Sequence, residues 1–200
     1  MKGSKIRRHE NLGAERVDSG NRESRNSIEQ IGRGSVELEV VMDARINVAK
    51  LNPGSYKVMY GFGEYLAKSS LDKKLIDLIS LRVSQINGCA FCLDMHWKDL
   101  KAAGETDQRM YSLDAWQETT YYSERERAAL TWAEATTNIR DGHVPEEIFE
   151  EVREQFSEQE IADLTLAVVA INGWNRLSIA FRNPAGTYQP GQFEKLKKTA

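Results

Sequence analysis

The feature that most constrains this chain is a pair of cysteines with a histidine one helical turn beyond them. Cys89 and Cys92 are the only two cysteines in 200 residues, and His96 follows Cys92 by four positions. A Cys-x-x-Cys element at the start of a helix brings two thiols within reach of a disulfide. We interpret this spacing as redox chemistry, which requires a fold that holds a helix N-terminus in place.

Length and composition indicate one folded domain and argue against a nucleic-acid binder. The chain has a mass of 22.7 kDa, and 40% of its residues are hydrophobic, which is enough for a real core. The net charge is −3, whereas a nucleic-acid binder usually shows a basic face. We therefore expect no nucleic-acid partner.

Targeting signals are weak, and they favour a cytoplasmic protein that does not enter a membrane. The N-terminus carries charges without an apolar segment, which is not typical of a secretory signal. The longest apolar stretch, residues 161–171, contains Asp163 and is shorter than the roughly 20 residues that span a bilayer. In a reducing compartment a Cys-x-x-Cys pair is usually catalytic or metal-binding rather than a static crosslink.

The chain divides by composition near residue 42. Residues 1–41 are rich in charges, glycine, serine and asparagine, with few large apolar side chains. Such a segment cannot bury enough surface to offset the entropy of ordering it, so we predict a disordered extension. It is also a candidate for an addition upstream of the natural start. Residues 42–200 are predicted to form the folded domain.

The folded part is predicted to be all-α, because no alternating strand pattern occurs in it. Asn52 and Pro53 are typical of a helix start, as are the two Ser-x-x-Glu capping boxes that begin at Ser123 and Ser157. Gly88 and Gly104 are typical helix ends. The predicted helices cover residues 53–68, 72–87, 89–103, 107–113, 123–139, a segment starting at 145, and 157–181.

Geometry along the helix suggests a role for each residue of the pair. The helix N-terminus stabilises a thiolate, which is the reactive form of cysteine. Positions 92 and 96 share one helical face, so His96 can accept the Cys92 proton directly or through a water. We therefore expect Cys92 to attack and Cys89 to resolve. If the preceding helix folds back on this one, Asp77 can complete a proton relay.

Other interpretations remain open at this stage. The two cysteines can be buried core thiols, or can bind zinc together with His96 and Asp77, although the usual second ligand pair is missing. Without its neighbours, His96 reads as an ordinary helix histidine and Asp77 as a surface carboxylate. His143 is expected to be structural, and the four tryptophans are expected to be core or interface anchors.

The run from Asp77 to His96, with Asn87-Gly88-Cys89-Ala90-Phe91-Cys92 at its centre, resembles the core motif of the AhpD-like alkylhydroperoxidases in the carboxymuconolactone decarboxylase superfamily. The similarity covers roughly residues 42–190 and includes the stretch 170–176. The resemblance implies an AhpD-like helical bundle that reduces hydroperoxides without a cofactor or a bound metal. It implies that Cys92 is peroxidatic, that Cys89 resolves, and that His96 and Asp77 form the relay.

Two departures from the family pattern are visible. The family's relay carboxylate is usually a glutamate, and Asp77 is one methylene shorter. Ala90 and Phe91 are more apolar than the residues between the cysteines in the best-studied branch, which favours a hydrophobic peroxide or a different reductant. The resemblance also implies a homotrimer or homohexamer and a lipoyl or thioredoxin-like dithiol as reductant.

The same residues leave other functions open. A general disulfide oxidoreductase uses the same pair without a peroxide. A non-enzymatic redox switch uses the disulfide to change assembly or partner binding. A lyase activity is weaker, because the decarboxylase branch does not depend on a Cys-x-x-Cys pair. Asn172, Trp174, Asn175 and Arg176 are expected to be structural first and to line the site or an interface second.

Overall fold

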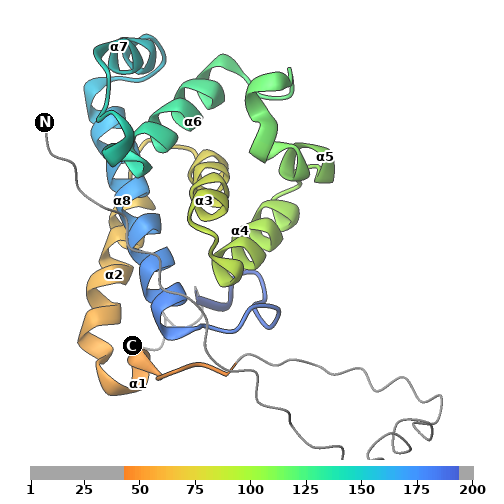
Figure 1. The fold of residues 1–200 in the computed structure, drawn as a ribbon, viewed down its shortest axis with the longest axis vertical. Coiled ribbons are helices and arrows are strands. Elements are labelled where there is room, and N and C mark those ends of the chain that lie inside the picture. The colour runs from red at the N-terminus through yellow and green to blue at the C-terminus, as the bar shows by residue number, and fades with distance from the viewer. Residues whose placement is uncertain (1–42, 194–200) are drawn as a thin grey trace, which may run out of the picture. The chain divides into compact units, whose positions relative to one another are not determined.

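The computed structural model describes residues 43–193, and these residues contain helices and no strand (Figure 1). The all-α prediction is therefore confirmed for this part of the chain. The predicted disordered segment lies outside the described residues. The elements are α1 (Val48–Leu51), α2 (Pro53–Leu66), α3 (Lys73–Asn87), α4 (Ala90–Ala102), α5 (Asp107–Tyr111), the 3₁₀ helix η1 (Leu113–Glu118), α6 (Glu124–Thr137), the 3₁₀ helix η2 (Ile139–Asp141), α7 (Glu146–Gln155) and α8 (Glu158–Phe181).

Most helix boundaries follow from the local signals in the sequence. Asn52 caps α2 by accepting a hydrogen bond from the Ser55 amide. Ser123 and Ser157 form complete capping boxes with Glu126 and Glu160 at the starts of α6 and α8. The short elements α1, η1 and η2 were not predicted, because segments this short carry little periodicity.

Helix α3 lies at the centre of the bundle and packs against α4, α6 and α8 (Figure 1). Its apolar residues supply the core, and Leu78, Ile79 and Val83 are at most 1% exposed. Helix α2 runs along α8, and α7 covers α6 at the other end of the bundle. The sequence Asn87-Gly88-Cys89 connects α3 to α4, so these two helices form a hairpin with the cysteines at its turn.

Helix α8 agrees with the helix predicted over residues 157–181, and it is longer than the apolar stretch that was compared with a membrane span. The stretch at 161–171 is short, but the helix that contains it has 24 residues and is long and apolar enough to cross a membrane. One such helix is weak evidence, because the core helix of a soluble protein passes the same test. Here α8 packs against α2, α3 and α6, and the buried Asp163 accepts a hydrogen bond from Tyr65 at 2.9 Å.

Candidate active site

The cysteine pair sits where the sequence places it, at the N-terminus of α4. Cys89 is the N-cap residue, Cys92 lies in the first turn, and a disulfide joins them across a Cα–Cα distance of 5.4 Å. Gly88 makes this turn possible because it adopts φ 68°, in the left-handed region where a side chain is strained. The first turn of a helix offers unpaired backbone N–H groups and partial positive charge, which favour a thiolate.

Both sulfur-bearing residues are almost fully buried, with 1% of each exposed. Burial disfavours a charged thiolate, so the helix N-terminus has to offset that cost. It also restricts access, because a large partner cannot reach either sulfur without a local opening. This degree of burial does not follow from the Cys-x-x-Cys spacing and is a finding of the structure.

The structure brings His96 and Asp77 together, as the hairpin of α3 and α4 requires. His96 Nδ1 lies 3.5 Å from Asp77 Oδ1, a distance at the limit of hydrogen bonding. Both residues are buried, and neither ring nitrogen of His96 has a hydrogen-bond partner. The imidazole is therefore held by packing and by the nearby carboxylate, with its nitrogens available to another group.

Lys73 is a third member of the cluster that contains Asp77 and His96. Its Nζ donates a hydrogen bond of 2.6 Å to Asp77 Oδ2, one helical turn away on α3. Burial by itself would raise the pKa of Asp77, but His96 and Lys73 together outweigh it and hold the pKa below its usual range. Asp77 is therefore an anion at neutral pH. Lys73 was not among the predicted site residues, although its i, i+4 spacing to Asp77 is a usable signal.

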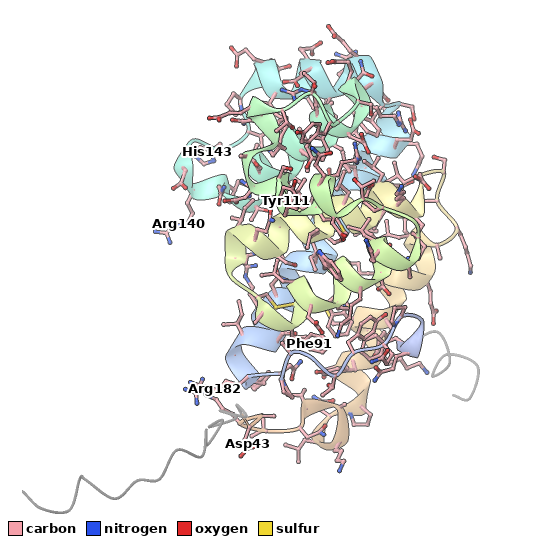
Figure 2. The ribbon with its side chains drawn as sticks, turned by 90° about the vertical axis from the view of Figure 1, so that its right-hand side faces the viewer. Asp43, Phe91, Tyr111, Arg140, His143 and Arg182 are labelled. Carbon is pink, nitrogen blue, oxygen red and sulfur yellow. A yellow bond between two sulfur atoms is a disulfide. The ribbon has the colours of Figure 1, made fainter. Side chains whose placement is uncertain are left out.

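A cavity of about 580 Å³ reaches Cys92. Its walls come from residues 44–47, α1, α2, the start of α3, one side of α4, the end of α8 and the segment 183–193, which we name the strap. Cys92 lines this cavity, whereas Cys89 and His96 are not among the described residues that line it. Phe91 contributes to the wall beside Cys92, and Figure 2 shows it at the end of the bundle where the strap passes.

The strap is fastened to α4 by polar contacts. Lys98 Nζ donates hydrogen bonds to the carbonyl oxygens of Gly186 at 3.0 Å and Tyr188 at 3.1 Å. The Tyr188 hydroxyl donates to the Asp99 carboxylate at 2.9 Å. Burial raises the pKa of Asp99 and outweighs this hydrogen bond, which lowers it. Asp99 and Tyr188 escaped the sequence analysis because they are 89 residues apart.

A buried amide network supports the cysteine turn. Asn87 Nδ2 donates to Asn172 Oδ1 at 3.0 Å and to Asn175 Oδ1 at 2.8 Å, and Asn175 Nδ2 donates to Ser84 Oγ at 3.1 Å. The backbone N–H of Cys89 in turn donates to the Ser84 carbonyl. Asn172 and Asn175 therefore have the structural role expected of them, and they tie α8 to the end of α3.

Other predicted residues fall as follows. Trp174 lines the cavity, in agreement with the second role expected for it. Arg176 donates to Asn172 at the exposed edge of the amide network. His143 is exposed in the loop before α7, far from Phe91 (Figure 2). Among residues 43–193, no group of three or more acidic, histidine or cysteine side chains is arranged to hold a metal ion.

These features define a class: an all-helical protein with a vicinal cysteine pair at a helix N-terminus and a histidine–aspartate pair beside it. The carboxymuconolactone decarboxylase family matches residues 53–135. The protein YdfG of Bacillus subtilis, which is uncharacterized, is 43% identical over 146 residues, or 73% of this chain and 99% of YdfG. The chain belongs to the carboxymuconolactone decarboxylase superfamily, among its AhpD-like members.

Two solved structures have a similar fold. A protein of unknown function from Agrobacterium tumefaciens, offered as a candidate antioxidant defence protein AhpD, is 40% identical with a TM-score of 0.70. The match extends over 73% of this chain and 100% of the Agrobacterium protein. The debrominase Bmp8 is 22% identical with a TM-score of 0.59, over 69% of this chain and 74% of Bmp8. At that identity Bmp8 shows a shared fold alone.

Proposed function

We propose that this protein is a dithiol peroxidase that reduces hydroperoxides through Cys89 and Cys92. The observation that carries the proposal is a cysteine pair at a helix N-terminus of which only Cys92 lines a cavity. A thiol that faces a cavity can meet a small molecule, whereas a thiol behind it is suited to the second step. The superfamily membership and the AhpD-like relative support the same reading.

The reaction is balanced in three steps. The Cys92 thiolate attacks the terminal peroxide oxygen, the O–O bond breaks, and Cys92 sulfenic acid forms as the alkoxide leaves and takes a proton. The Cys89 thiol then attacks that sulfur, which forms the disulfide and releases water. An external dithiol restores both thiols by exchange and is itself oxidised to a disulfide.

His96 and Asp77 have supporting roles in this scheme. His96 accepts the Cys92 proton and returns a proton to the departing alkoxide. Asp77 stabilises the imidazolium that forms in between, from 3.5 Å away. The contact is longer than a good hydrogen bond, which fits the shorter side chain of aspartate. No cofactor is needed for any of these steps.

Burial of the pair favours the peroxidase over a general disulfide oxidoreductase. Both cysteine residues are only 1% exposed, which hinders contact with the disulfide of a folded protein, whereas a hydroperoxide inside the cavity lies next to Cys92. The same argument favours a slender reductant, such as a lipoyl arm, over a thioredoxin-like domain. A cytoplasmic location and assembly into a homotrimer or homohexamer belong to the proposal as well.

The first test is single-turnover oxidation of the fully reduced chain. One equivalent of an organic hydroperoxide should remove two hydrogens from the intact mass, read under denaturing conditions. Cys92→Ser should stop the reaction, and Cys89→Ser should add one oxygen and stop there. An unchanged mass in the parent, or oxidation of both variants at the parent's rate, would overturn the proposal.

A further inference from the structure

The cavity beside Cys92 has an aromatic wall that the proposed chemistry does not by itself require. Five rings form a continuous chain around it, each in contact with the next. The centroid distances are 5.4 Å for Tyr56–Trp174, 5.3 Å for Trp174–Tyr60, 6.3 Å for Tyr60–Phe193 and 5.5 Å for Phe193–Tyr188. All five of these residues line the cavity together with Cys92.

The geometry of these rings is suited to hold a further ring. The Tyr56–Trp174 pair meets edge to face at 71°, and Tyr60 tilts against Trp174 at 48°. Aromatic side chains prefer edge-to-face and offset contacts, which are more favourable than the buried area alone would make them. Met59 and Met95 add adaptable apolar surface to the same wall.

The charged residues of the cavity are engaged with other side chains. Lys73 is hydrogen-bonded to Asp77, and Asp99 accepts the hydroxyl of Tyr188. Burial raises the pKa of Tyr188, and the bond to Asp99 raises it further, so this phenol stays neutral. The surface presented to an occupant is therefore mainly apolar, and it disfavours a carboxylate or phosphate.

The size of the cavity points the same way. A volume of about 580 Å³ falls within the roughly 300–1,000 Å³ typical of sites for organic ligands. A water molecule takes about 30 Å³ of liquid, and hydrogen peroxide is of similar scale. A peroxide of two oxygens would leave this wall unused, whereas a ring-bearing hydroperoxide would bury most of its surface against it.

On these grounds we propose that the preferred substrate is an uncharged hydroperoxide with an aromatic ring, and that Tyr60 and Trp174 determine that preference. The substrate ring packs against these two side chains from the cavity side and directs the peroxide group toward Cys92. This inference rests on the proposed function for its chemistry. It goes further by naming the substrate class and the residues that select it.

The experiment compares second-order rate constants for thiol loss in the reduced full-length protein. The probes are cumene hydroperoxide, tert-butyl hydroperoxide, which lacks a ring, and hydrogen peroxide. We expect cumene hydroperoxide to react at least tenfold faster than tert-butyl hydroperoxide. Equal rates for the two organic peroxides would overturn the inference and leave the peroxidase intact, whereas no reaction with any probe would overturn the peroxidase itself.

Variants assign the preference to the two residues. Tyr60→Ala and Trp174→Leu should each lower the cumene to hydrogen peroxide rate ratio about tenfold, while Tyr60→Phe, which keeps the ring, should retain it. Tyr111 is 71% exposed and does not line the cavity, so Tyr111→Ala is the matched control and should leave the ratio unchanged. If the cumene to hydrogen peroxide rate ratio stayed unchanged in both Tyr60→Ala and Trp174→Leu, these rings would not select the substrate.

A binding measurement separates recognition from reaction. In the Cys89→Ser/Cys92→Ser protein, cumyl alcohol should bind measurably by calorimetry, and tert-butanol should bind at least tenfold more weakly. Adding Tyr60→Ala to this double variant should reduce the affinity for cumyl alcohol and leave the affinity for tert-butanol unchanged. Equal affinities for the two alcohols would contradict the inference even if a variant used for the rates proved unstable.

Discussion

At the scale of single residues, the arrangement of His96 is the most consequential. It is buried beside Asp77, yet both ring nitrogens lack a hydrogen-bond partner. Buried polar groups are normally satisfied, so an unsatisfied imidazole one turn from Cys92 is typical of a group kept available for chemistry. We therefore expect His96 to matter more for catalysis than for the stability of the fold.

Substitution of His96 by asparagine should therefore slow oxidation of Cys92 while leaving the fold intact. General-base catalysis contributes roughly 10²–10⁴-fold, so we expect a loss of about 10²-fold in the rate constant for thiol loss with an organic hydroperoxide. His143→Asn provides the control, because that histidine is exposed in the loop before α7. If the His96 variant matched the parent, the proton would have to leave by another route.

Asp77 links the site to the stability of the protein. Its pKa in the folded state is lowered, so its contribution is fully present above the unfolded value of about 3.9 and is lost as the pH falls through the folded value. We expect the free energy of unfolding to drop as the pH is lowered past this unfolded value, because the folded protein then holds an ionised carboxylate that the unfolded chain does not.

Asp77→Asn should show a shallower drop over the same range, measured by urea denaturation at several pH values. Glu118→Gln, at an exposed position on η1, is the control and should keep the parent's slope. A parent and an Asp77 variant with parallel pH profiles would show that His96 and Lys73 do not stabilise the ionised carboxylate.

At the scale of elements, the hairpin of α3 and α4 depends on one backbone conformation. Gly88 takes φ 68° and ψ 36°, and a side chain placed there would meet no atom within 4 Å. The cost of a substitution is therefore conformational rather than steric. A non-glycine residue in this region costs roughly 1–2 kcal/mol, and asparagine tolerates it best.

Gly88→Ala should lower the free energy of unfolding by about 1–2 kcal/mol, and Gly88→Asn by less. Because the same turn positions Cys89, the alanine variant should also form the Cys89–Cys92 disulfide more slowly after sulfenic acid appears. Chemical denaturation and quenched intact-mass measurements report the two effects. Equal stability of the alanine and asparagine variants would argue that the turn relaxes out of the left-handed region.

The elements also show how far the sequence alone could lead. Gly88, Asn52 and the two capping boxes act through neighbours in the chain, so the helices they bound were predictable. The proximity of Asp77 and His96 followed once α3 and α4 were assumed to pack. The aromatic wall was not predictable, since Tyr60 and Phe193 meet across more than 130 positions and neither carries a local signal.

At the scale of the whole folded part, the strap closes the cavity from the far end of the chain. Lys98 holds it through two carbonyls and through Asp94, whose carboxylate also accepts the Gly186 amide at 3.1 Å. Hydrogen bonds to charged groups contribute about 1.5–3 kcal/mol each when buried, and less where they are exposed. The strap is thus the part of the wall that a single substitution can release.

Lys98→Met should release the strap without melting the bundle. We expect several-fold faster limited proteolysis within residues 183–193 and a far-ultraviolet circular dichroism spectrum like that of the parent. Lys101→Met is the control. Lys101 lies on the same helix, but it binds Asp107 and not the strap, so this variant should be cleaved at the parent's rate. Unchanged cleavage in the Lys98 variant would mean that apolar contacts of Tyr188 and Phe193 suffice.

The order in which the cavity walls are synthesised has a consequence for the thiols. Cys92 leaves the ribosome with α2 already made, but Phe193 follows about 100 residues later, and at about 5–20 residues per second this takes roughly 5–20 seconds. During that interval the nascent protein holds both cysteines while α8 and the strap do not yet exist. Throughout that interval both thiols are open to solutes, because the walls supplied by α8 and the strap have not yet been made.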